Sequence, residues 1–234
     1  MGKRVLVVDA DPQGSVGYSL TRKTRTLKGF FDYLTADVPS FESVLVPTKM
    51  PTLTLVPAGQ SSAYDVDPGL HASASDLVKE FLTEAEKEDY DICIVDTAAG
   101  LFGVTKDVLL VSDAVMIPQQ AEPLGIRSMP KMLAALKEVR DMNPRLYILG
   151  VLLTMVQGQL PESVDAANAL RDILPENLVM RSEIPRDDLF IKASARGLPV
   201  GIMEGAEEVL GEFNALRTEI EEKLNILRPS RQEG

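Results

Sequence analysis

Apolar runs alternate with helical patterns along the whole chain. Val5–Val8 is an uninterrupted apolar run, typical of a strand buried on both faces, and it ends at the turn-forming run Asp9–Ser15. Similar patterns predict further strands over 53–56, 90–96, 114–117, 146–154 and 179–184, and helices over 16–20, 30–34, 69–88, 104–111, 124–140, 161–173 and 204–227. Strands that alternate with helices predict an α/β three-layer sandwich, with a mostly parallel sheet covered by helices on both faces. Because no linker or internal repeat interrupts it, we expect one domain over residues 1–234.

Two carboxylates one residue apart, Asp9 and Asp11, follow the first strand directly, with Pro12 and Gly14 after them. In a parallel sheet, ligands bind at the carboxyl ends of the strands. The spacing is suited to metal, bound water or phosphate chemistry, and equally to carboxylates that cap a turn or the next helix. Asp96 repeats the arrangement at the end of the apolar run 92–95, where a carboxylate can hold Mg²⁺ through its water shell.

Composition excludes several classes of function. A hydrophobic content of 45% supports a substantial core, and the lone Cys93 and His71 are too few soft ligands for a zinc site. The net charge of -11 argues against a broad basic surface for nucleic acid. No apolar run approaches the roughly 20 residues that cross a bilayer, and the N-terminus turns acidic too soon for a signal peptide. We therefore expect a cytoplasmic protein without a membrane partner.

The stretches VLVVDADPQGS and YDICIVDTAAG together resemble the ParA family of partition ATPases, within the group that includes MinD and other deviant-Walker ATPases. The resemblance continues through 114–119, where the family has a strand ending in a proline near the nucleotide. It extends through 150–155, through Ile184-Pro-Arg-Asp187 and through 193–200. It spans nearly the whole chain in order, DADPQG is its most specific part, and it implies a P-loop NTPase-like fold.

The resemblance assigns roles to the three strand-tip carboxylates. Asp11 would orient the attacking water, and Asp9 would lie beside Mg²⁺ and the γ-phosphate. Asp96 would be the Walker B carboxylate and the metal-holding residue. The implied cofactors are therefore ATP and Mg²⁺.

Pro185 and Arg186 fall where the family packs its adenine ring, and Gln119 lies close to the same pocket. Without the resemblance, Pro185 and Arg186 read as a strand-ending turn with an exposed arginine. The implied function is partitioning or positioning of a plasmid, chromosome or other cargo by an ATP-dependent homodimer, with a ParB-like or other stimulating partner. Non-specific DNA binding through a few arginines stays open.

One part of the family pattern is absent. ParA-like ATPases begin with a strand, a KGGxGKT loop and a helix, and only then reach the equivalent of GKRVLVVDADPQG, where this sequence starts. A sheet without its first central strand would split or leave two apolar edges unpaired. Three explanations are open. Met1 can be an internal methionine of a longer protein, or a separate polypeptide can supply the segment. Alternatively, the chain is a nucleotide-independent relative whose sheet has closed.

Three smaller departures from the family pattern concern base contacts and partner coupling. Thr97-Ala-Ala-Gly100 replaces a segment that contains proline in the family. Met155-Val-Gln-Gly158 lacks the family's usual Asn or Asp and its Arg, and Lys192 stands where the family commonly has an acid. The resemblance implies an ATP hydrolase, whereas this sequence lacks the family's KGGxGKT loop. The alternative is a non-hydrolysing pseudo-ATPase that acts as a partner-binding module. A MinD-like positioning ATPase is disfavoured, because 225–234 offers only Ile226 and Leu227 as apolar membrane anchors.

Overall fold

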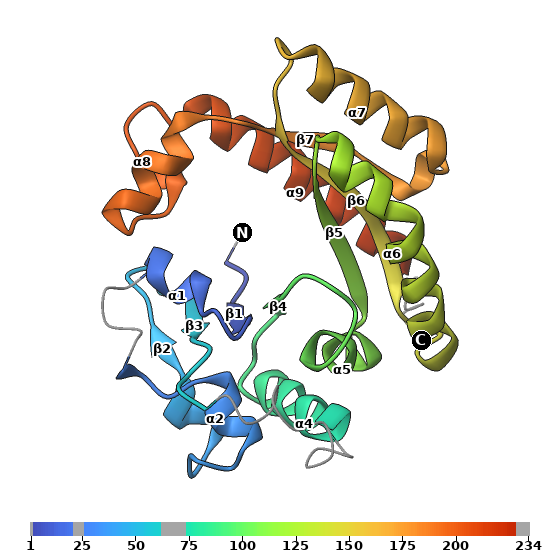
Figure 1. Cartoon of the computed structure of the whole chain (residues 1–234). Coiled ribbons are helices and arrows are strands. Elements are labelled where there is room, and N and C mark those ends of the chain that lie inside the picture. The colour runs from blue at the N-terminus through green and yellow to red at the C-terminus, as the bar shows by residue number, and fades with distance from the viewer. Residues whose placement is uncertain (1, 21–25, 62–73, 228–234) are drawn as a thin grey trace, which may run out of the picture. The chain divides into compact units, whose positions relative to one another are not determined.

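The computed structural model describes residues 2–20, 26–61 and 74–227, and it contains two compact units, each with its own sheet (Figure 1). Unit 1 comprises Met1–Ser112, Glu138–Pro144 and Arg196–Leu198. Unit 2 comprises the remaining residues, from Asp113 onward.

The sheet of unit 1 has four strands in the order β2-β3-β1-β4. β1 is parallel to both β3 and β4, and β2 is antiparallel to β3. The strands are β1 Val5–Ala10, β2 Val46–Pro47, β3 Leu53–Val56 and β4 Ile92–Thr97, and the helices are α1 Ser15–Leu20, α2 Phe30–Leu34, the 3-10 helix η2 Phe41–Val44, α4 Ala74–Lys87 and α5 Val104–Val111.

The core of unit 1 lies on one face of this sheet. Alternate residues of β1, Leu6 and Val8, are fully buried there against α2 and α4. Phe81 of α4 is the centre of an aromatic cluster, with its ring centroid 5.0 Å from those of both Phe30 and Phe41. The alternate buried residues of β1 and the helically spaced apolar residues of α4 thus pack into one apolar cluster.

β4 departs from the expected burial. The pattern predicts a strand buried on both faces, yet Ile92 and Ile94 are 43% and 52% exposed, while Cys93 and Val95 face the core. Within the described ranges, no strand pairs with the outer edge of β4. The sequence predicts either a split sheet or two unpaired apolar edges, and the described residues form two separate sheets with β4 at the end of one of them.

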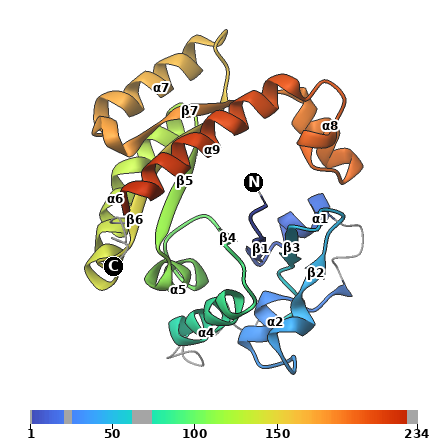
Figure 2. The ribbon, with the colours of Figure 1, turned by 180° about the vertical axis from the view of Figure 1, so that it is seen from behind.

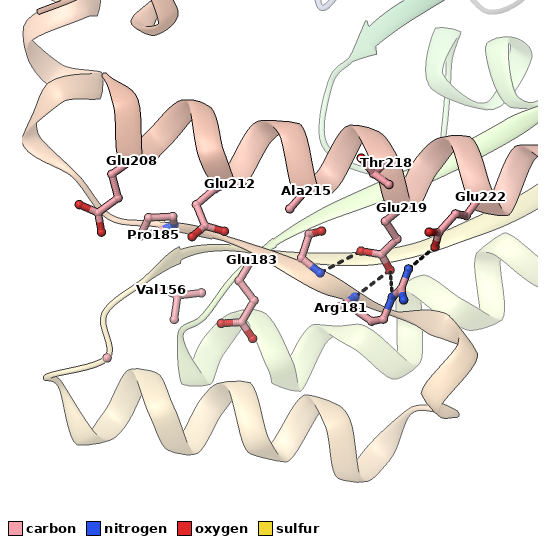
Figure 3. Close-up of a pocket in the computed structure, with 12 residues that line it drawn as sticks. Val156, Arg181, Glu183, Pro185, Glu208, Glu212, Ala215, Thr218, Glu219 and Glu222 are labelled. Carbon is pink, nitrogen blue, oxygen red and sulfur yellow. Dashed lines mark hydrogen bonds and ion pairs between the residues drawn. The ribbon is translucent and has the colours of Figure 1, made fainter. Parts of the chain in front are cut away.

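Unit 2 contains a three-stranded parallel sheet in the order β5-β6-β7. α9 lies across one face of β6 and β7 and α7 lies on the other (Figures 2 and 3). The strands are β5 Ala114–Gln120, β6 Tyr147–Val156 and β7 Val179–Pro185, and the helices are α6 Pro123–Met142, α7 Pro161–Ile173, α8 Asp188–Arg196 and α9 Glu207–Leu227, with 3-10 turns η3 Glu176–Leu178 and η4 Val200–Ile202.

The α/β three-layer class is confirmed, and most predicted elements occur within a few residues of their expected bounds. β2 and α8 were not predicted, and β5 continues past its predicted end at residue 117 through Pro118 to Gln120. Proline is tolerated there because β5 is the outermost strand of its sheet among the described residues, and the N–H groups on its outer side join no ladder there. His71 and the start of the helix predicted over 69–88 lie outside the described residues. No helix in the described ranges has the length and apolarity to cross a membrane.

Candidate functional site

Two of the predicted carboxylates lie side by side at the carboxyl ends of neighbouring parallel strands. In the pairing of β1 with β4, Val8 lies opposite Val95 and Asp9 lies opposite Asp96. Asp11 follows in the loop after β1. The structure thus brings together the three carboxylates that the sequence predicts for the Mg²⁺ and water side of the site.

Asp9 is fully buried and caps the helix that follows. Its Oδ2 accepts hydrogen bonds from the backbone N–H groups of Val16 (3.0 Å) and Gly17 (3.2 Å), in the first turn of α1. Its Oδ1 accepts one from Asp11 N at 3.3 Å. Burial raises the pKa of Asp9 despite these hydrogen bonds. Of the two interpretations left open by the sequence, helix capping is therefore present, and the position beside Mg²⁺ stays a prediction.

Asp11 begins a tight turn at the carboxyl end of the sheet. Its Oδ1 accepts a hydrogen bond from Gln13 N at 2.8 Å, and its carbonyl oxygen accepts one from Gly14 N at 2.8 Å. Gly14 adopts a left-handed conformation with a φ of 66°, which a glycine adopts without strain. The turn holds the Asp11 carboxylate close to the strand tips.

The surroundings of Asp96 disfavour the charged form of its carboxyl group. Its pKa is raised first by partial burial and then by the charges of Asp9 and Asp11. A cation would relieve this repulsion, and Mg²⁺ fits because it takes oxygen ligands and keeps several waters. In the described part of the chain, no three acidic, histidine or cysteine side chains are placed to hold a metal ion together.

Residues 1–234 lack the sequence element that binds a nucleotide's phosphates in P-loop proteins. Residues 1–234 contain no G-K-S/T sequence, the element whose backbone amides and lysine bind phosphates in P-loop proteins. The carboxylates of unit 1 therefore fit the metal and water side of a nucleotide site, and the phosphate side is not assigned to residues of this chain.

Asp32 is a positioning residue that the sequence interpretation missed. It is fully buried, and its carboxylate accepts hydrogen bonds from Gly29 N (2.8 Å), Gln60 N (2.9 Å) and Ser61 Oγ (2.8 Å). It thereby ties the loop after β3 to the start of α2. A Cβ at Gly29 would lie 2.0 Å from the carbonyl oxygen of Pro57, so only glycine permits this approach. An acid three residues after the N-cap, here Gly29, is a capping signal that could have identified Asp32.

The three residues predicted for the adenine pocket all lie in unit 2, at the carboxyl ends of its strands. Gln119 lies near the end of β5, and its Nε2 donates to the carbonyl oxygen of Gln120 at 3.1 Å. Pro185 ends β7, and the N–H of the exposed Arg186 donates to the carbonyl oxygen of Val156 at 3.0 Å. All three residues lie at the carboxyl ends of the strands of the β5-β6-β7 sheet. Their role in base binding stays a prediction.

A groove between α9 and β7 contains Pro185 and was not expected from the sequence (Figure 3). Its volume is about 750 Å³, and it is strongly acidic. Glu208 and Glu212 lie at the Pro185 end, while Arg181 forms an ion pair with Glu222 at the other. The full lining is Val156, Gly158, Arg181, Ser182, Glu183, Pro185, Glu208, Glu212, Ala215, Thr218, Glu219 and Glu222.

Several known proteins are similar to this chain in sequence and in fold. The family model described as "AAA domain" matches residues 1–148. The chromosome partitioning protein ParA of Caulobacter vibrioides (strain NA1000 / CB15N) is 30% identical over 206 residues, which are 85% of this chain and 75% of that protein. The chromosome-partitioning ATPase Soj of Thermus thermophilus is 32% identical over 201 residues, 84% of this chain and 75% of that protein.

Among solved structures, cobyrinic acid a,c-diamide synthase of Mycobacterium smegmatis with bound ATP analog and magnesium is 29% identical, with a TM-score of 0.69 over 84% of this chain and 79% of that one. MinD of Pyrococcus horikoshii complexed with Mg-ADP shares the fold at 19% identity, with a TM-score of 0.71 over 97% and 87% of the two chains. The paired strand-tip carboxylates, the family model and the relatives agree, and the chain belongs to the ParA family of partition ATPases.

Proposed function

We propose that the protein is an ATP-dependent switch that partitions or positions a plasmid, a chromosome or another cellular cargo. ATP closes a homodimer, a ParB-like or other partner stimulates hydrolysis, and hydrolysis resets the switch. The observation that carries the proposal is the alignment of Asp9 and Asp96 at the carboxyl ends of β1 and β4, with Asp11 beside them. Relatives named as chromosome partitioning proteins support the cargo class.

In this proposal each predicted residue has a task. Asp96 would hold Mg²⁺ through its waters, and Asp11 would orient the attacking water. Asp9 would lie beside Mg²⁺ and the γ-phosphate, while its hydrogen bonds to Val16 and Gly17 keep the intervening loop and α1 in place. Pro185 and Arg186 border the adenine ring together with the nearby Gln119. Bound Mg²⁺ would neutralise the charge of the transferred phosphoryl group. Cytoplasmic location and non-specific DNA binding stay predictions.

The Asp11 assignment is tested by Mg²⁺-dependent ATP hydrolysis of the complete protein that carries these residues. We expect Asp11→Ala to lower turnover by about 100-fold or more, because a positioned group that manages a reacting water contributes at least that much. Asp165→Ala, on the exposed side of α7, is the matched control and should leave turnover unchanged. Normal turnover in Asp11→Ala would remove Asp11 from the mechanism.

A second candidate is a non-hydrolysing module that binds partners. It is favoured by the lack of a G-K-S/T sequence in residues 1–234. It predicts no change in the melting temperature of residues 1–234 when ATP and Mg²⁺ are added, although the protein is folded. Tight ATP binding by residues 1–234 would reject this candidate, since a bound ligand stabilises the folded state by mass action.

A further inference from the structure

We propose that Asp32 is a positioning residue for ATP hydrolysis, because it holds the loop 57–61 beside the turn that carries Asp11. This inference rests on the proposed function, in which Asp11 orients the attacking water. Asp32 itself touches neither the nucleotide nor that water and acts through the backbone of the loop. The loop, the turn and Asp32 all belong to unit 1.

The first half of the loop is joined to the start of α2 by backbone hydrogen bonds. Phe30 N donates to the carbonyl oxygen of Pro57 at 2.8 Å, and Phe31 N donates to that of Ala58 at 2.9 Å. Pro57 and Ala58 are buried, so their carbonyl groups need partners within the protein. The partners are N–H groups that the start of a helix would otherwise leave unsatisfied.

The second half of the loop is held by the Asp32 carboxylate. It accepts hydrogen bonds from Gln60 N at 2.9 Å, Ser61 N at 3.2 Å and Ser61 Oγ at 2.8 Å. Between the two halves, Gly59 has a φ of 96°, and a Cβ there would lie 2.1 Å from Asp32 Oδ2. Burial alone would raise the pKa of Asp32, but the hydrogen bonds from Gln60 and Gly29 outweigh burial and lower it. The charged carboxylate therefore holds the loop at neutral pH.

The loop lies beside the turn that carries Asp11. β1 pairs with β3 with Val8 opposite Val56, so the turn after β1 and the loop after β3 leave the sheet at the same edge. A Cβ on Gly14 would lie 3.7 Å from the Cβ of Ala58, which is the distance of ordinary van der Waals contact. Gly14 N in turn donates to the carbonyl oxygen of Asp11 at 2.8 Å. A shift of the loop would therefore displace the turn and its carboxylate.

The test is ATP hydrolysis by the complete protein that carries these residues, with kcat and the KM for ATP measured separately. In Asp32→Asn, an NH2 group replaces one carboxylate oxygen and faces N–H or O–H donors in place of an acceptor. We expect kcat to fall by at least about tenfold, because a small misplacement of a group that acts on the reacting atoms is costly. The KM for ATP should change by less than about twofold, since Asp32 does not touch the nucleotide.

Asp37→Asn is the matched control. Lys28 forms ion pairs with both Asp32 and Asp37, but Asp37 is exposed, and Lys28 is the partner of its carboxylate. Asp37→Asn removes a carboxylate beside Lys28 and leaves the hydrogen bonds of the loop in place. It should therefore leave both kcat and the KM for ATP unchanged.

Hydrogen exchange of the complete protein without nucleotide separates this inference from the proposed function. We expect the amides of Gln13 and Gly14 to exchange faster in Asp32→Asn, while the amides of β4 keep their protection. Unchanged exchange at Gln13 and Gly14 would overturn the positioning role, and so would a wild-type kcat in Asp32→Asn. If the complete wild-type protein hydrolyses no ATP, the proposed function fails, and the exchange at Gln13 and Gly14 still decides whether Asp32 positions the turn.

A milder variant keeps the test decisive if circular dichroism shows that Asp32→Asn is unfolded. Ser61→Ala removes only the hydroxyl donor and leaves the backbone hydrogen bonds to Asp32. Faster exchange of the Gly14 amide in Ser61→Ala than in the wild type is then the expected result. Equal exchange in the two proteins would overturn the proposal.

Discussion

Two aspartates at opposite ends of β4 have pKa values shifted in opposite directions. Asp91 accepts hydrogen bonds from Lys3 Nζ and Arg4 N, both at 2.8 Å, and these partners lower its pKa. Asp96 has its pKa raised, first by partial burial and then by the charges of Asp9 and Asp11. At the amino end of β4, the basic partners of Asp91 stabilise its charged carboxylate. At the carboxyl end, in the candidate site, the surroundings of Asp96 destabilise its charged carboxylate.

We predict that Asp96→Asn is more stable than the wild type at pH 7. A carboxyl group whose pKa is higher in the folded state binds protons more tightly there, so the free energy of unfolding decreases as the pH rises through that pKa. Asparagine removes this penalty while keeping the shape of the side chain. The advantage should disappear below pH about 4, where the wild-type carboxyl group is also neutral. Urea unfolding at pH 7 and pH 3.5, in the presence of EDTA, measures both differences.

Asp91→Asn is the matched control, with the opposite sign. Because the folded-state pKa of Asp91 is lowered, its contribution is present at neutral pH and is lost as the pH falls. Asp91→Asn should therefore be slightly less stable than the wild type at pH 7. Equal effects of the two substitutions would mean that the local charges do not control the stability of this strand.

At the scale of elements, a buried glutamate joins α9 to β7. Glu219 is only 3% exposed, and its two carboxylate oxygens accept hydrogen bonds from Arg181 N at 2.8 Å and Ser182 N at 2.9 Å (Figure 3). These amides belong to the stretch where β7 leaves its ladder with β6. Burial alone would raise the pKa of Glu219, but the hydrogen bonds from these amides outweigh burial and lower it. One side chain thus satisfies two backbone donors of the bulged strand.

Glu219→Gln should lower the free energy of unfolding at pH 7 by about 1–3 kcal/mol, since its NH2 group would face a backbone donor in place of an acceptor. The wild-type advantage should be lost as the pH falls through the lowered pKa of Glu219, because the carboxylate is then protonated in the folded state. Guanidinium unfolding at pH 7 and at pH 3 tests both statements.

Glu222→Gln, one turn further along α9, is the control for this prediction. Glu222 is exposed and forms a surface ion pair with Arg181, so its replacement should change stability by less than about 1 kcal/mol. If Glu222→Gln costs as much as Glu219→Gln, the net charge of the groove and not the clamp on β7 sets the stability.

The type of an element and the role of a residue were predictable where one physical rule decides them, and not where two rules give different answers. Helical spacing identified α9, but the sequence does not show which of its many glutamates is buried, because that depends on the amides exposed by the bulge in β7. An aspartate at a strand tip is equally suited to a ligand and to a cap, so Asp9 stayed ambiguous until its bonds to Val16 and Gly17 were seen. The local capping signal of Asp32 at Gly29 could be read from the sequence, but its hydrogen bonds with Gln60 and Ser61 could not, because these partners are distant in sequence.

At the scale of the whole molecule, each unit has a buried core of its own. Phe81 is fully buried in unit 1, where its ring meets those of Phe30, Tyr33 and Phe41. Leu153 of β6 is fully buried in unit 2. The sequence predicts one domain over residues 1–234, whereas two sheets with separate cores lead us to expect that the units unfold in two steps.

Phe81→Ala distinguishes these expectations, because it removes a ring from the core of unit 1 alone. The loss of a buried phenylalanine costs about 3–5 kcal/mol. We expect calorimetry to show a lower melting temperature for one transition, and hydrogen exchange to locate it in α2, α4 and β1, while the amides of β6 and β7 keep their protection. Leu153→Ala, which costs about 2–5 kcal/mol, should do the reverse. If either substitution lowers the melting temperature of a single transition that involves all strands, the two cores are coupled and the one-domain prediction holds. In one cooperative unit, a local loss of packing lowers the stability of every element equally.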